Sequence, residues 1–138
     1  MKLSNGTKIF LTIIFFIASI IGFMVKLPSG FRHSDKILHA AYYFIAAAFL
    51  NFLFSRKNIL IHLLIFGCLY LFGVSIEYAQ PWSNKFFHVR IHGRYDPEDI
   101  KYNLRGLMAF SVLWITIVGV LFVYQKATNK GIADPGNS

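Results

Sequence analysis

The chain contains an uncharged stretch, LMAFSVLWITIVGVLFVY, at residues 107–124. The hydrocarbon core of a bilayer is about 30 Å thick, and a helix needs about 20 predominantly apolar residues to cross it. Lipid offers no hydrogen-bonding partner to backbone groups, so such a segment must satisfy them internally as a helix. The stretch therefore predicts a transmembrane helix.

Three stretches upstream have the same character: Ile9–Val25, Ile37–Phe54 and Ile59–Ile76. The whole chain is 56% hydrophobic and 14% charged, whereas a soluble domain carries roughly 25% charged residues. We therefore predict an all-α fold, an integral membrane four-helix bundle with short loops. One domain would cover residues 1–127, and a disordered polar C-terminal tail would cover residues 128–138. The first stretch is longer than the apolar region of a signal peptide, and no A-x-A-like site follows it, so we expect an uncleaved helix.

The net charge of +8 does not indicate nucleic-acid binding. The basic residues are scattered among the predicted loops, where they would meet lipid phosphates. Eight of the Lys and Arg residues lie on the side of the loops that join helices one to two and three to four, and six lie on the side of the termini. Several of the eight lie beside acidic residues, so we expect both termini in the cytoplasm.

The connections between the stretches predict how the helices are arranged. The turn at residues 55–58 is short enough to force an antiparallel hairpin, and we place His62 beyond it near the headgroups. Residues 81–96 read as a loop rich in aromatic and basic side chains, which suits the headgroup layer. The fourth helix has a start signal, with Asp96 as N-cap, Pro97 at the first helical position and acidic residues in the first turn.

Acidic residues gather at one end of this predicted bundle. With four spans, the start of the second helix, the end of the third and the start of the fourth share one membrane face. Five of the six acidic residues lie there: Asp35, Glu77, Asp96, Glu98 and Asp99. An ionisable side chain inside the apolar boundary is costly and should face a partner or a water-filled pocket. We therefore expect a polar site at this face.

Three sequence motifs in this region resemble those of the VanZ-like family. A second-helix motif of that family reads approximately D-K-x-x-H followed by Tyr, and this chain has DKILH at residues 35–39 and then Tyr42-Tyr43. A helix-end motif, E-x-x-Q, corresponds to EYAQ at residues 77–80. A third, in the style of R-x-x-D-x-x-x-N-x-x-G, corresponds to residues 94–106, although Phe110 stands where many relatives carry a second glycine. The similarity covers about residues 35–110.

This resemblance implies a bacterial, multi-pass protein of the cytoplasmic (inner) membrane that is associated with the cell envelope. VanZ-like proteins are linked to low-level antibiotic resistance, namely to the glycopeptide teicoplanin. The resemblance also implies that the polar site consists of the motif residues: Asp35, Lys36, His39, Tyr43, Glu77, Gln80, Arg94, Asp96, Asp99, Asn103 and Gly106.

Several activities remain open for such a site. The first is binding of a lipid or cell-wall-precursor headgroup without chemistry. The second is a membrane-embedded enzyme acting on a lipid or polyprenyl headgroup, with His39 and Glu77 exchanging protons and cations holding phosphate. The third is a structural or partner-binding network, in which polar side chains fix the helix packing.

Metal binding is a fourth alternative for the site. His39, Glu77 and Asp99, with Asp35, have ligand-type side chains on separate helices. The one H-x-x-x-H match, HVRIH at residues 88–92, falls in the predicted loop, and the chain has no H-E-x-x-H motif, so we expect no metal and no cofactor. The expected partners are the lipid bilayer, a headgroup and a second copy of the chain, with no nucleic acid.

Overall fold

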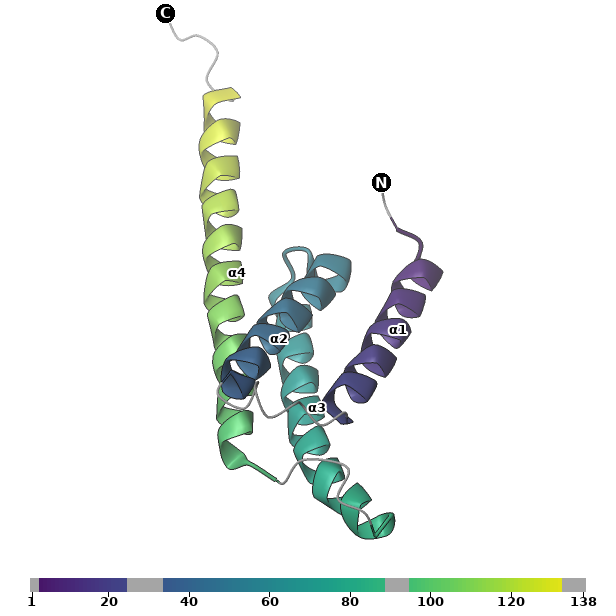
Figure 1. Cartoon of the computed structure of the whole chain (residues 1–138). Coiled ribbons are helices and arrows are strands. Elements are labelled where there is room, and N and C mark those ends of the chain that lie inside the picture. Colours follow the sequence, from purple (N-terminus) through teal and green to yellow (C-terminus); the bar gives the residue numbers. More distant parts are fainter. Residues whose placement is uncertain (1–2, 25–33, 89–94, 133–138) are drawn as a thin grey trace, which may run out of the picture.

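Four long helices make up the computed structural model of this protein, which describes residues 3–24, 34–88 and 95–132. They are α1 (Asn5–Met24), α2 (Asp35–Leu50), α3 (Ile59–Phe86) and α4 (Pro97–Ile132), and a π-helical segment, η2 (Asn51–Ser55), continues α2 (Figure 1). All four are long and apolar enough to cross a membrane. The predicted all-α architecture of a multi-pass membrane protein is therefore confirmed.

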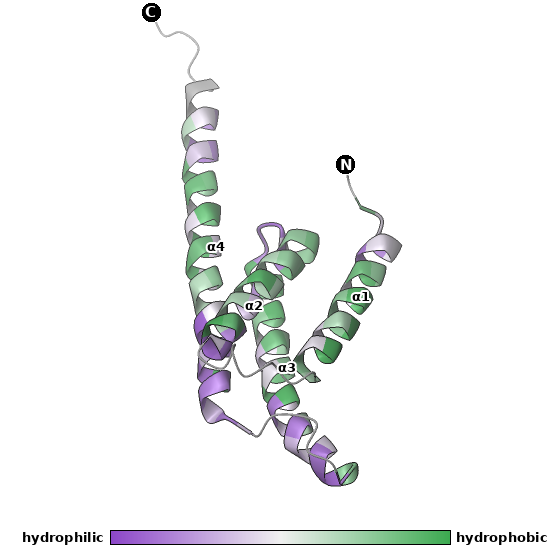
Figure 2. Cartoon of the chain, viewed as in Figure 1, coloured by the Kyte–Doolittle hydropathy of each residue, from purple (hydrophilic) through white to green (hydrophobic). Residues whose placement is uncertain are grey.

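The outer surface of the helices is apolar. Phe52 is 81% exposed and Leu60 is 73% exposed, which suits side chains that face acyl chains rather than water. Figure 2 shows hydrophobic residues along most of the bundle and hydrophilic residues at the lower ends of α3 and α4. This lower end is the face at which the sequence predicts the polar site.

Helices α2, α3 and α4 form the core of the protein. Buried apolar residues from all three pack together there: Tyr43, Ala46, Ala47, Leu50, Ile65, Leu69, Leu107, Phe110 and Trp114. Helix α1 lies beside α3 (Figure 1), and Ser19 is the buried residue of α1. Its hydroxyl accepts a hydrogen bond from Tyr42, and the Phe23 carbonyl accepts one from Gln80 Nε2 at 3.0 Å. These two contacts attach α1 to the other helices.

The connections between α2, α3 and α4 agree with the sequence signals at two places. The Asn58 side chain caps α3 by accepting from the backbone N–H groups of Leu60 and Ile61 at 2.9 and 3.3 Å, which closes the predicted α2–α3 hairpin. Asp96 Oδ1 accepts from the Glu98 N–H at 2.8 Å. Asp96 is therefore the N-cap of α4, as predicted.

The predicted loop at residues 81–96 is wrong in its first part. Helix α3 continues through Pro81 to Phe86, which is six residues beyond Gln80, the last residue before the predicted loop. Proline removes one backbone donor from a helix and is usually disfavoured inside it. Here the following turn is supported by the Ser83 hydroxyl, which donates to the Gln80 carbonyl at 2.8 Å, and by stacking of Trp82 on Phe86.

Helix α4 also runs further than its predicted span. It ends at Ile132, so the first residues of the predicted tail at 128–138 are helical, and residues 133–138 lie outside the described ranges. The longer helix follows from the sequence after Tyr124, which contains good helix formers and no proline before Pro135.

Candidate functional site

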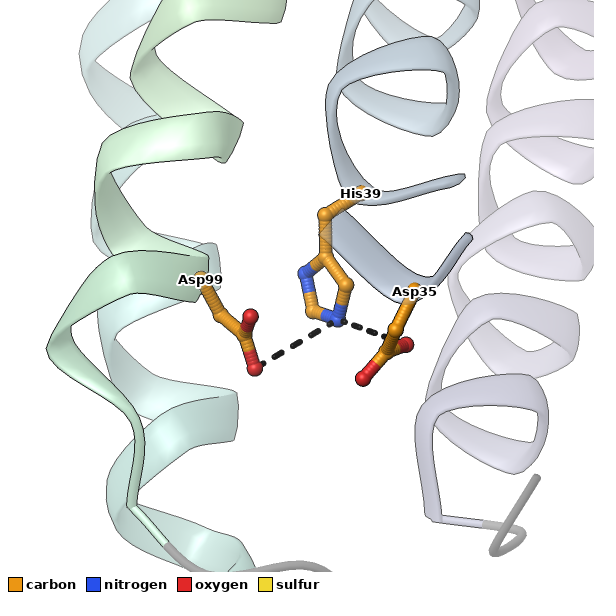
Figure 3. A group of neighbouring side chains, drawn as sticks. All are labelled: Asp35, His39 and Asp99. Atoms are coloured by element: carbon orange, nitrogen blue, oxygen red, sulfur yellow. Dashed lines mark ion pairs between the residues drawn. The ribbon is translucent and has the colours of Figure 1, made fainter. Parts of the chain in front are cut away.

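The site is built around His39, which α2 places against α4. His39 is 7% exposed, and its Nδ1 lies 2.9 Å from Asn103 Oδ1 of α4. An amide oxygen only accepts hydrogen bonds, so Nδ1 carries a proton and donates it to Asn103. The other ring nitrogen, Nε2, faces Asp35 and Asp99 (Figure 3).

Two carboxylates flank this second nitrogen of His39 (Figure 3). Asp35 lies one turn earlier on α2 and places Oδ1 at 3.8 Å from Nε2. Asp99 lies one turn before Asn103 on α4 and places Oδ2 at 3.8 Å from the same atom. One ligand-type atom from each of the three residues lies within 4.8 Å of the others. These distances exceed a hydrogen bond, so three potential acceptors converge with space between them.

Glu77 brings a third carboxylate to this end of the bundle from α3. Its side chain is 1% exposed, and Oε2 accepts from the Asp96 N–H at 3.1 Å. Glu77 thus ties the end of α3 to the N-cap residue of α4, and it interacts electrostatically with both Asp99 and His39. Glu77 Oε1 and Asp99 Oδ1 are buried and have no hydrogen-bond partner in the part of the chain that the structure describes.

Two glycines allow the helices to approach closely enough for these contacts. A Cβ atom at Gly106 would lie 2.1 Å from the carbonyl oxygen of Ala40, so α4 and α2 touch backbone to backbone at this point. A Cβ atom at Gly73 would lie 2.7 Å from the Tyr43 hydroxyl oxygen and 2.9 Å from Asn103 Nδ2. Small residues at helix interfaces commonly serve this purpose in membranes.

The structure separates the predicted site residues into three groups. Asp35, His39, Asp99 and Asn103 form the centre of the site. Tyr43, Glu77, Asp96 and Gly106 surround it and fix the helices. Lys36 pairs with Glu98 at the surface, and Gln80 faces α1 through its bond to Phe23. Arg94 lies outside the described residues.

Sequence reasoning missed Phe23 and the partner of Lys36. The ring of Phe23 lies 5.2 Å from the ring of His39 and 4.7 Å from that of Tyr42, measured between centroids, so α1 covers one side of the site. A phenylalanine inside an apolar span carries no signal of such a role. Glu98 was visible as a first-turn acid, but its pairing with Lys36 depends on how α2 and α4 meet.

A second polar cluster lies in the other half of the bundle, around His62 near the start of α3. This histidine is 2% exposed, which the sequence did not indicate. Its Nδ1 lies 2.9 Å from Asn51 Oδ1, and its Nε2 lies 3.1 Å from the Ser111 hydroxyl. Its ring stacks on Trp114 at 4.2 Å between centroids. Both ring nitrogens are satisfied, so this cluster is a closed structural network.

The fold and the site define a multi-pass helical membrane protein with a carboxylate- and histidine-containing site at one end of the bundle. No family model, curated protein or solved structure matches the chain.

Proposed function

We propose that this chain is an envelope-associated protein of the bacterial cytoplasmic membrane that binds a lipid or cell-wall-precursor headgroup at this site. The observation that carries the proposal is the pair of buried carboxylate oxygens, Glu77 Oε1 and Asp99 Oδ1, that lack a partner among the described residues. Leaving a buried acceptor unsatisfied costs about 1–3 kcal/mol. A ligand that supplies donors to these oxygens offsets this cost when it binds.

The charges of the site favour hydroxyl and ammonium groups over a phosphate in direct contact. Asp35, Glu77 and Asp99 are acceptors when ionised, and a phosphate among them would meet like charges. Lys36 is already paired with Glu98, so it supports direct phosphate binding less than the sequence alone suggested. Sugar hydroxyls and amines, which occur in envelope precursors and lipid heads, are the donors that fit.

The location of the site supports a ligand that is itself anchored in the membrane. Asp35 is partly exposed, with 37% of its side chain accessible, and it lies at the first residue of a span whose outer surface is apolar. A lipid-anchored headgroup at the water–lipid boundary would meet the site at this depth. The resemblance of the motifs to the VanZ-like family adds an expected phenotype, which is reduced susceptibility to teicoplanin.

The orientation of His39 supports a second candidate function, which is an enzyme that acts on the bound headgroup. His39 is held in one orientation by Asn103, and the free Nε2 lies between two carboxylates. A histidine oriented in this way can accept a proton from a headgroup hydroxyl. Turnover of the bound headgroup that is lost in His39→Gln would favour this candidate over binding alone.

Native mass spectrometry of the purified protein with its co-isolated lipids tests the proposal. Glu77→Gln keeps an acceptor for the Asp96 N–H but removes the charge, and Glu98→Gln is the matched control at an exposed glutamate of α4. We expect a defined lipid or precursor on the wild type and on Glu98→Gln, and its loss on Glu77→Gln. The same lipids on all three proteins, or none on any, would contradict headgroup binding.

A susceptibility measurement tests the envelope role separately. The wild type and Glu77→Gln are expressed to equal membrane levels in a susceptible bacterium, and growth is measured against teicoplanin. We expect protection by the wild type alone. A bound headgroup without protection would leave the binding function standing and remove the resistance role.

A further inference from the structure

Three electron-pair donors converge at one point, and they belong to Asp35, His39 and Asp99. When His39 is neutral and the two aspartates are ionised, none of these three atoms carries a proton that it could donate to another. Nδ1 of His39 donates to Asn103, so in the neutral ring Nε2 carries the lone pair. Carboxylate oxygens of Asp35 and Asp99 lie 3.8 Å from this nitrogen. Such a convergence of acceptors is costly unless a cation lies between them.

The size of this group suits a metal ion. The three ligand atoms form a triangle. Asp35 Oδ1 and Asp99 Oδ2 each lie 3.8 Å from His39 Nε2, and all three atoms lie within 4.8 Å of one another. An ion equidistant from the corners of such a triangle would lie about 2.2–2.5 Å from each, near the bond lengths of about 2.0–2.6 Å that proteins make to Zn²⁺ and Ca²⁺. Only small side-chain shifts are needed for ligation.

A second, independent observation points to a missing ligand. Asp99 is 8% exposed, its carboxylate faces His39 (Figure 3), and its Oδ1 has no hydrogen-bond partner among the described residues. Glu77 adds another buried carboxylate that interacts electrostatically with Asp99 and His39. A divalent cation would offset this negative charge better than a single proton on His39.

The surroundings of His39 also resemble a metal ligand's environment. Metal-bound histidines almost always donate their other ring N–H to an oxygen, which fixes the tautomer and the ring orientation. Asn103 provides this oxygen, and the close contact of Gly106 with Ala40 holds the two helices at a fixed separation. Asp35 is partly exposed, so coordination positions remain open on its side, as in exchangeable rather than structural sites.

We propose that Asp35, His39 and Asp99 bind a divalent transition-metal ion of the Zn²⁺ or Mn²⁺ class, in place of the absence of metal that the sequence led us to expect. One imidazole and two carboxylates form a mixed set that suits these ions better than Mg²⁺ or Ca²⁺, which prefer oxygen ligands alone. The inference rests on the site of the proposed function and deepens it. The open coordination positions of the ion would bind a hydroxyl or phosphate oxygen of the headgroup. The positive charge of the ion would then allow a phosphate to bind that the carboxylates alone would repel.

The test uses the full chain in nanodiscs, with His33, His88 and His92 changed to Gln so that their imidazoles do not compete for the metal. The protein is stripped with EDTA, and binding of Zn²⁺ and Mn²⁺ is measured by calorimetry, with Mg²⁺ for comparison. Co²⁺ serves as a spectroscopic probe that Zn²⁺ displaces. We expect one ion per chain, with Zn²⁺ and Mn²⁺ bound more tightly than Mg²⁺.

Substitutions assign the ion to the three residues. We expect His39→Gln and Asp99→Asn to weaken Zn²⁺ binding at least about tenfold, and Asn103→Leu to weaken it about 10–100-fold through the lost orientation of His39. His62→Gln and Glu98→Gln are the matched controls and should bind as the parent does. Equal affinity in His39→Gln, Asp99→Asn and the controls would overturn the proposal, as would the absence of stoichiometric binding in the parent.

A measurement on the unsubstituted chain covers the case in which a variant fails to fold. Fe²⁺ with ascorbate oxidises residues that hold the metal, and mass spectrometry locates them. Oxidation of His39 in preference to His62, which is also buried, supports the site, and equal oxidation of the two contradicts it. If EDTA-stripped protein binds no metal but retains its headgroup, the metal inference fails and the proposed function stands. If metal binds and no headgroup does, the proposed function fails alone.

Discussion

His39 donates a hydrogen bond from Nδ1 to Asn103 Oδ1 across the interface of α2 and α4, at a distance of 2.9 Å. Both residues are buried, with exposed fractions of 7% and 2%. The bond joins residues 64 positions apart in the sequence. It therefore fixes both the relative position of the two helices and the orientation of the imidazole.

The first prediction follows from this bond. We expect Asn103→Leu to lower the free energy of unfolding by about 1–2 kcal/mol, since that is the upper range for a hydrogen bond between membrane helices and the His39 Nδ1–H is left without its partner. Reversible unfolding by SDS in mixed micelles measures the change. The same change in a His39→Leu background, where the donor is already absent, serves as the control. Equal stability of Asn103→Leu and the wild type would show that the bond contributes nothing to the fold.

The second prediction concerns the contact of Gly106 with Ala40. A methyl group at Gly106 would overlap the Ala40 carbonyl, which is backbone and cannot move by side-chain rotation. We expect Gly106→Ala to destabilise the protein by about 1–3 kcal/mol, the usual cost of overpacking. It should also separate His39 from Asn103.

Gly119 lies on the same helix and supplies the matched control. A Cβ atom there would meet nothing within 4 Å, so Gly119→Ala should be neutral or stabilise α4 by up to about 1 kcal/mol through its higher helix propensity. Thermal unfolding of both variants in the same detergent makes the comparison. A similar loss in both would mean that the α2–α4 approach does not depend on Gly106.

The helix boundaries show how much of the fold the sequence alone could predict. The four spans were predictable because each is an apolar run of the required length, and so was the start of α4 at its Asp96–Pro97 signal. The end of α3 was not, because Pro81 reads as a helix stop and only the contacts of Ser83 and Trp82 show that the helix continues.

The site was predictable only along each helix. Spacing places Asp35 with His39, and Asp99 with Asn103, on common helix faces. The contacts between helices, such as His39 with Asn103 and Glu77 with the Asp96 N–H, depend on how closely the backbones approach. His62 shows the same limit, because its position near the start of α3 gives no sign that η2 and α4 enclose it.

The third prediction concerns this second histidine. We expect His62→Ala to lower the stability by about 2–4 kcal/mol, because it opens a cavity against Trp114 and removes two buried hydrogen bonds. In a Trp82→Phe background, Trp114 is the remaining tryptophan, so its emission reports on the stacked pair directly. The emission should change in His62→Ala and stay unchanged in His39→Gln, which lies at the other cluster. Unaltered emission and stability in His62→Ala would argue against the stack.

The fourth prediction concerns the orientation of the chain in the membrane. Helix α1 begins and α4 ends toward the same end of the molecule, opposite the site (Figure 1). On the site side, Lys36 is paired with Glu98 and Arg105 lies over the ring of Tyr102 at 4.5 Å, so part of the positive charge there is engaged within the protein. Without these two, six Lys and Arg residues remain on each side, and those on the terminal side have only Asp134 among the acidic residues beside them, so we take the terminal side as the cytoplasmic one.

We therefore expect the termini in the cytoplasm and the site on the outer face, where it would meet envelope precursors after their export. A green fluorescent protein fused to the C-terminus should fluoresce, since it folds in the cytoplasm, and alkaline phosphatase at the same position should be inactive. A phosphatase inserted after residue 91 is the opposite-side control and should be active. An active phosphatase at the C-terminus would place the site inside the cell and restrict its ligands to headgroups and precursors of the inner leaflet.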